Sequence, residues 1–111
     1  MKNDQLPDVV IRYFELMDGE AKEQVADLFT PDAQVTDDGT TYRGRAEITA
    51  WLTGQASEWV TTSTQLSADW IDQTAVVVTR VEGNFPGGRV DLRNAFTLDP
   101  AERISALSIS A

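Results

Sequence analysis

The sequence predicts one small α+β domain in which helices pack on a strongly curved antiparallel sheet around a pocket. In the first half of the 111-residue chain, apolar residues recur at helical spacing. From Val60 onward, strand-like segments alternate with turn signals. Helices that precede a run of antiparallel strands are typical of an α+β layout. Because no repeat or linker-like stretch interrupts residues 1–111, we expect a single domain.

Three helices are expected, at about residues 5–17, 20–29 and 45–58. Gly19 separates the first two, and a strand at 33–38 separates the second from the third. The side chains expected to face inward from these helices are Val9, Val10, Tyr13, Leu16, Met17, Val25, Leu28, Phe29, Ile48, Trp51 and Leu52.

The remaining segments read as strands at 33–38, 61–71, 74–85, 89–98 and 103–110, so that the element order is ααβαββββ. A two-residue turn at Gly87-Gly88 would pair the third and fourth of these strands with Thr79 opposite Phe96. This register separates apolar from charged faces, and a one-residue slip would mix them. The charged side chains that then face away from the helices are Arg80, Glu82, Asp91 and Arg93.

The composition excludes several kinds of function. With 18 acidic and 9 basic residues, the net charge of −9 repels phosphate backbones and anionic lipids, so we expect neither nucleic-acid nor membrane binding. Cysteine and histidine are both absent, which excludes thiolate nucleophiles and a Ser–His–Asp triad and argues against a metal site. The first residues lack an apolar run, so no signal peptide is predicted and a cytoplasmic location is expected.

Three polar residues interrupt the apolar inward faces: Tyr13, Asp37 and Asn94. A buried polar group without a partner costs about 1–3 kcal/mol, and a shared pocket would supply partners for all three. A buried carboxylate is a stronger base, and two neutral donors aimed at one oxygen stabilise an oxyanion. The other side chains expected to line this pocket are Phe14, Met17, Val35, Trp51, Trp59, Val77, Thr79, Val81 and Phe96.

Each polar residue also has a purely structural interpretation. Tyr13 is also compatible with a core aromatic whose hydroxyl reaches the surface, which is the commoner role of tyrosine. Asp37 precedes Asp38-Gly39 and is suited to hydrogen-bonding its own turn, and Asn94 is suited to bridging backbone groups. The tryptophans, too, fit core packing as well as a pocket wall.

The order and spacing of four segments resemble the nuclear transport factor 2-like superfamily, in its SnoaL-like and ketosteroid isomerase-like branch. The segments are RYFELMDG at 12–19, DLFTPDAQVTDDG at 27–39, YRGRAEITAWL at 42–52 and NAFTLDPAERI at 94–104. The resemblance extends over about residues 5–110 and implies a cone of three helices capping a bent sheet. It also implies a pocket for a small apolar molecule, and a homodimer.

Three positions match the pattern of ketosteroid isomerases. A tyrosine follows an arginine on the first helix, as in Arg12-Tyr13, and a general-base aspartate lies on the first strand, as Asp37 does. Asn94 stands where those enzymes carry a protonated aspartate. The resemblance implies proton transfer next to a carbonyl, of isomerase or cyclase type, without metal or organic cofactor. It leaves open a non-catalytic module that binds a ligand or dimerises.

A related branch hydrolyses epoxides with an Arg–x–Asp on a strand and a second aspartate on the last strand. Here the corresponding residues are Arg80-Val81-Glu82 and Ile109, and isoleucine cannot activate water. We therefore do not expect epoxide hydrolysis. The mixed charges on the outward face are suited to pairing across a two-fold axis, which agrees with the expected homodimer, and equally to a solvated surface.

Overall fold

The computed structural model describes residues 6–19, 22–54 and 60–111. Its elements are α1 (Asp8–Met17), the 3-10 helix η2 (Lys22–Leu28), β1 (Phe29–Asp37), β2 (Thr40–Arg43), α2 (Gly44–Thr53), β3 (Thr61–Ile71), β4 (Thr74–Gly83), β5 (Arg89–Leu98) and β6 (Ile104–Ser110). The α+β class is confirmed.

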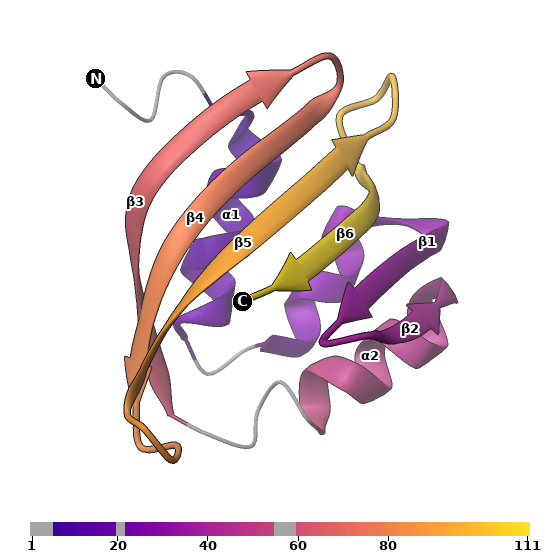
Figure 1. Cartoon of the computed structure of the whole chain (residues 1–111). Coiled ribbons are helices and arrows are strands. Elements are labelled where there is room, and N and C mark those ends of the chain that lie inside the picture. The colour runs from indigo at the N-terminus through magenta and orange to yellow at the C-terminus, as the bar shows by residue number, and fades with distance from the viewer. Residues whose placement is uncertain (1–5, 20–21, 55–59) are drawn as a thin grey trace.

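A six-stranded sheet with the order β2-β1-β6-β5-β4-β3 forms the body of the molecule. Its neighbouring strands are antiparallel except β1 and β6, which run parallel. Figure 1 shows the long strands β3, β4 and β5 bending across the molecule, with α1 behind them and α2 beside β1 and β2. The helices therefore cover the concave side of a bent, mixed sheet.

Three expectations about the order of elements need correction. The segment 20–29 is not an α-helix: a 3-10 helix of seven residues occupies Lys22–Leu28, which is longer than most helices of this kind. The sheet is mixed, not wholly antiparallel. An additional strand, β2, begins at Thr40, because Asp38 and Gly39 both take positive φ and close a two-residue hairpin turn. Residues 55–58, where the third helix was expected to end, lie outside the described residues.

The register predicted for the β4–β5 hairpin is wrong by four residues. Thr79 pairs with Leu92 and not with Phe96. The connection takes residues 84–88 instead of a two-residue turn, and the amide of Gly88 donates to the Phe85 carbonyl at 2.9 Å. Since a shift by an even number of residues leaves each side chain on its original face, the predicted inward and outward faces remain correct.

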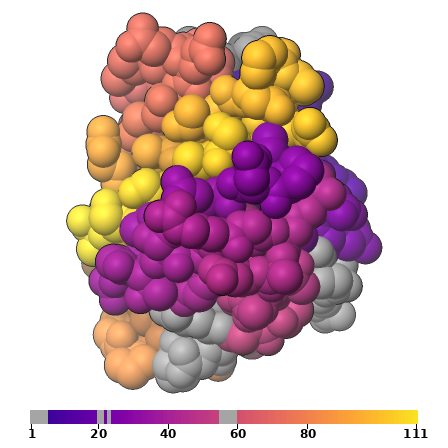
Figure 2. Space-filling model, turned by 90° about the vertical axis from the view of Figure 1, so that its right-hand side faces the viewer, coloured from indigo at the N-terminus to yellow at the C-terminus, as the bar shows by residue number. Residues whose placement is uncertain are grey.

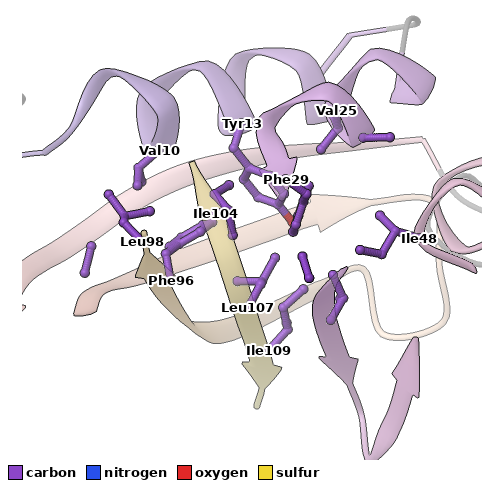
Figure 3. Close-up of a cluster of buried hydrophobic side chains, with 14 of the residues drawn as sticks. Val10, Tyr13, Val25, Phe29, Ile48, Phe96, Leu98, Ile104, Leu107 and Ile109 are labelled. Carbon is purple, nitrogen blue, oxygen red and sulfur yellow. The ribbon is translucent and has the colours of Figure 1, made fainter. Parts of the chain in front are cut away.

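An aromatic cluster fixes α1 on the sheet. The ring of Tyr13 lies 5.0 Å from Phe96 and 5.1 Å from Phe14, and Phe14 lies 5.6 Å from Phe96, all edge to face. Such pairs add about 0.5–1.5 kcal/mol each beyond the burial of their area. Figure 3 shows Tyr13 pointing from α1 into the buried cluster, between the helices and the sheet.

Polar contacts fix α2 at the other side of the sheet. The guanidinium of Arg45 donates to the Phe29 carbonyl through Nη2 at 2.7 Å and Nε at 3.2 Å. The Glu47 carboxylate accepts the backbone N–H of Arg43 at 2.7 Å and so satisfies a free donor at the start of the helix. In Figure 2, the purple-to-magenta segments that include β1, β2 and α2 form one continuous surface. Trp51 is thereby held over the end of β1.

Within the described ranges, no helix has the length and apolar character needed to cross a membrane.

The close approach of β3 to β4 should make Gly83 intolerant of a side chain. A Cβ at Gly83 would overlap the Val60 carbonyl oxygen and would lie 2.9 Å from the Thr61 side chain. We expect Gly83→Ala to lower the free energy of unfolding by about 1–3 kcal/mol, measured by urea denaturation. Gly19→Ala is the matched control, because its Cβ would meet only ordinary contacts at 3.6 Å and beyond. Equal stability of the two variants would contradict the prediction.

Candidate functional site

A pocket of about 130 Å³ lies between the helices and the inner face of the sheet. Helical segments and their ends form one wall, and strands β1 and β3–β6 form the other. The lining residues are Tyr13, Phe14, Met17, Asp18, Lys22, Asp37, Trp51, Thr61, Ser63, Thr79, Val81, Leu92, Asn94 and Ile109.

The sheet register brings two of the predicted polar residues into one row. Asn94 on β5 pairs with Ile109 on β6, and Ile109 pairs with Asp37 on β1. Directly paired residues point to the same face, and two strand spacings separate Asn94 from Asp37 by about 10 Å. Tyr13 reaches the same pocket from α1. All three polar residues singled out from the sequence therefore line one pocket, while their catalytic roles stay predictions.

Tyr13 is the most enclosed of the ionisable groups in the pocket wall. Only 2% of its surface is exposed. Burial, and then the negative charge of Asp37, raise the pKa of the phenol above its ordinary value. Within the described part of the chain, its hydroxyl has no hydrogen-bond partner. The hydroxyl therefore stays protonated at neutral pH and can donate to a ligand.

Asp37 is half-buried at the end of β1. Its Oδ2 accepts a hydrogen bond from Trp51 Nε1 at 3.0 Å. This carboxylate thus accepts a hydrogen bond from α2. Since one oxygen is held by the indole, the carboxylate is oriented while its Oδ1 keeps its lone pairs for a proton or a ligand.

Asn94 is 4% exposed and uses its amide inside the protein. Its Nδ2 lies 3.0 Å from the Val77 carbonyl oxygen, 3.2 Å from Thr79 Oγ1 and 3.4 Å from the Leu92 carbonyl oxygen. An amide nitrogen has only two hydrogens, so these acceptors account for both. The structural interpretation of Asn94 as a bridge between backbone groups is therefore observed, although the side chain also borders the pocket.

The predicted wall residues divide into two groups. Phe14, Met17, Trp51, Thr79 and Val81 border the pocket. The following three belong to the close-packed core and do not border it: Val35, Val77 and Phe96. For Phe96 the reason is visible, because the rings of Tyr13 and Phe14 fill the space above it. Trp59 lies outside the described residues.

Several wall residues were not predicted. Leu92 and Ile109 lie on the same face as Asn94, and period-two alternation along their strands is a signal that could have found them. Asp18 and Lys22 flank the connection between α1 and η2, where no periodic pattern applies. Burial lowers the pKa of Lys22, and the charge of Asp18 opposes this shift. Among the described residues, no cluster of three or more metal-ligating side chains occurs.

The comparison with protein families finds one match, to the model of the SnoaL-like domain, over residues 10–102. No curated protein sequence matches the chain. Among solved structures, one that is similar throughout is a proposed polyketide cyclase from Sinorhizobium meliloti. It is 29% identical with a TM-score of 0.90, and the alignment covers 99% of this chain and 100% of that one.

Two further structures share the fold at lower identity. A Catenulispora acidiphila protein with a ketosteroid isomerase-like fold, in complex with trimethylamine, is 18% identical, with a TM-score of 0.84 and coverage of 95% and 85%. The epoxide hydrolase/cyclase-like enzyme SalBIII, which acts in pyran ring formation, is also 18% identical, with a TM-score of 0.80 and coverage of 98% and 92%. The fold, the pocket and the family match agree, and the chain belongs to the SnoaL-like domain family of the nuclear transport factor 2-like superfamily.

Proposed function

We propose that this protein is an enzyme that moves a proton next to a carbonyl group in a small, largely apolar molecule. The observation that carries the proposal is the position of Tyr13 and Asp37 in the walls of one pocket. One supplies a neutral hydroxyl donor and the other a carboxylate. These are the two groups that enolisation needs, a base for the carbon acid and a donor for the developing oxyanion.

In this mechanism Asp37 Oδ1 takes the proton from the carbon beside the carbonyl. The electron pair of the broken C–H bond forms the enolate, and the negative charge moves to the carbonyl oxygen. Tyr13 donates a hydrogen bond to that oxygen, and its raised pKa keeps the phenol protonated while the enolate exists. In an isomerisation, Asp37 then returns the proton to a different carbon. In a cyclisation, the enolate carbon instead attacks a second carbonyl carbon, the π electron pair of that carbonyl moves to its oxygen, and the resulting alkoxide takes the proton from Asp37. Trp51 holds the carboxylate in position throughout.

The size of the pocket limits the substrate. Its volume of about 130 Å³ is close to that of an engineered apolar cavity of about 150 Å³ that binds benzene, and it is smaller than the roughly 300–1,000 Å³ of drug-sized sites. A molecule about the size of one ring therefore fits. A neighbouring hollow of about 240 Å³ shares Phe14, Asp18, Ser63 and Thr79 with the pocket and offers room for a substituent.

One relative and the residues of this site support a carbonyl substrate more than an epoxide. The Sinorhizobium meliloti relative is a proposed cyclase of polyketides. Hydrolysis of an epoxide would need a carboxylate on the last strand, where Ile109 faces the pocket. Arg80 is bound on the outer face of the sheet by Asp91, with a distance of 2.9 Å between Nε and Oδ1. We therefore do not propose epoxide hydrolysis.

A second candidate function is binding without chemistry. The pocket combines the carboxylate of Asp37 with the aromatic rings of Tyr13, Phe14 and Trp51. Carboxylates and aromatic faces together attract small organic cations, and the Catenulispora acidiphila relative is in complex with trimethylamine. Calorimetric titration with tetramethylammonium separates the candidates, since a cation site binds it and a site built only for enolates does not.

A phenolate mimics the planar enolate and tests the proposed roles. Tyr13→Phe should weaken phenolate binding about 10-fold, through loss of a charge-assisted hydrogen bond. Asp37→Asn should strengthen phenolate binding by a similar factor, because the substitution removes a negative charge while the amide oxygen can still accept the hydrogen bond from Trp51. Isothermal titration calorimetry measures both. Tyr42→Phe is the control, since Tyr42 does not border the pocket. Unchanged affinity in the two pocket variants would refute the proposed roles.

The burial of Tyr13 predicts a loss of stability at alkaline pH. Above its ordinary pKa of about 10, the phenol deprotonates in the unfolded chain but not in the folded protein. The unfolded state then binds fewer protons, so this group lowers the free energy of unfolding by up to about 1.4 kcal/mol per pH unit until the folded pKa is reached. Tyr13→Phe should remove that contribution. Urea unfolding at roughly pH 8 and pH 11 measures the change in the free energy of unfolding for the wild type and for Tyr13→Phe. An equal decrease in the two proteins would contradict the prediction.

We also propose that two copies associate through the outer face of the sheet. Arg80 and Asp91 pair within one chain, and Ala95 lies four residues from Asp91 on the same outer face of β5, where its small side chain leaves room for a second copy. Sedimentation equilibrium at micromolar concentration should show a dimer, and Ala95→Lys should weaken it by placing a charge in the contact. A wild-type protein that sediments only as a monomer would exclude this association.

A further inference from the structure

The orientation of the Asn94 amide is decided by its neighbours. Both the Val77 and the Leu92 carbonyl oxygens lie within hydrogen-bond distance of Nδ2. Carbonyl oxygens only accept, so the amino group must face them, since a flipped amide would place oxygen against oxygen. Asn94 therefore donates through Nδ2 to these carbonyl oxygens.

The same amino group determines how the Thr79 hydroxyl is used. Thr79 Oγ1 lies 3.2 Å from Asn94 Nδ2. An amide nitrogen cannot accept, so the hydroxyl accepts here and keeps its own hydrogen for another partner. No residue in the described ranges receives that hydrogen, because the Thr79 side chain forms no hydrogen bond there other than the one from Asn94.

The Thr79 hydroxyl can donate its hydrogen to a ligand in the pocket. The residue is 3% exposed and borders both the pocket and the neighbouring hollow. A buried hydroxyl favours a partner, and β-branching restricts its χ1 rotamers. Bound on its acceptor side by Asn94, the hydroxyl is a preorganised donor of the kind that stabilises an oxyanion.

We propose that Thr79 supplies the second hydrogen bond to the ligand oxygen, beside Tyr13, and that Asn94 is a positioning residue that acts through Thr79. This inference rests on the proposed function and extends it. It assigns the site to ligands whose oxygen accepts two hydrogen bonds, a carbonyl that becomes an enolate or a phenolate. It also explains how Asn94 serves the site although its amide hydrogens are bound inside the protein.

The test compares phenolate with toluene, which has the same ring without the oxygen. Both are titrated by calorimetry into the Asp37→Asn protein, where the carboxylate no longer repels an anion. Thr79→Val should weaken phenolate binding about 10-fold or more and leave toluene binding unchanged. Thr79→Ser, which keeps the hydroxyl, should bind phenolate within about threefold of the parent. The Asn94 amide retains two carbonyl acceptors in Thr79→Val, which favours a folded variant.

Asn94→Leu tests the positioning role. This substitution should weaken the binding of phenolate but not the binding of toluene. The double variant with Thr79→Val should bind phenolate no more weakly than Thr79→Val alone, because both substitutions act through one hydrogen bond. Equal losses for phenolate and toluene would show that Asn94 has only a structural role. Should Thr79→Val not fold, Thr79→Ala replaces it in the comparison with Thr79→Ser.

The outcomes separate this inference from the proposed function. If Tyr13→Phe weakens phenolate binding and Thr79→Val does not, the inference about Thr79 is wrong and the proposed function stands. If neither substitution changes phenolate binding, or if phenolate does not bind, both are overturned.

Discussion

The parallel pairing of β1 with β6 is the constraint on which the site depends. It places Asp37 beside Ile109, and the antiparallel pairing of β6 with β5 places Ile109 beside Asn94. Two polar residues that are far apart in the sequence thereby lie in one row of the inner face. Parallel neighbours need a long connection, and here the chain from β2 to β5 supplies it. The site therefore exists only when the last strand is in place.

The helices complete the site through two different anchors. Edge-to-face packing of Tyr13 and Phe14 on Phe96 attaches α1 to the sheet and directs the Tyr13 hydroxyl inward. Arg45 attaches α2 to β1 through the Phe29 carbonyl, and Trp51 then reaches Asp37. Packing thus sets the position of the hydroxyl donor, and hydrogen bonds set the orientation of the carboxylate.

The polar groups around the pocket divide by where their partners lie. Across the described residues, every fully buried side-chain nitrogen or oxygen has a hydrogen-bond partner. Asn94 finds its partners in the protein, which identifies it as part of the support of the site. The hydroxyls of Tyr13 and Thr79 have a hydrogen to give that no described residue receives. Groups of the second kind are the ones with which a ligand can bond.

The sequence by itself determined which sides of α1, β1, β4 and β5 face inward. Period-two alternation along the strands and 3.6-residue periodicity along α1 depend on local geometry alone, and they selected Tyr13, Asp37 and Asn94. They also explain why a hairpin register wrong by four residues still gave the correct faces. The resemblance of the segments to a known family predicted the fold, because the order of the segments follows the order of the elements.

Only the tertiary structure decided how far each strand slides past its neighbour and which partner each polar group takes. The parallel β1–β6 pair leaves no local pattern, since it depends on contacts between distant segments. The strand β2 does have a local signal, because Asp38-Gly39 closes the hairpin that pairs it with β1. In contrast, nothing in the sequence places the amide of Asn94 between Val77 and Thr79. Hydrogen-bond partners are fixed by distances of a few tenths of an ångström, and such distances result from the packing of the whole domain.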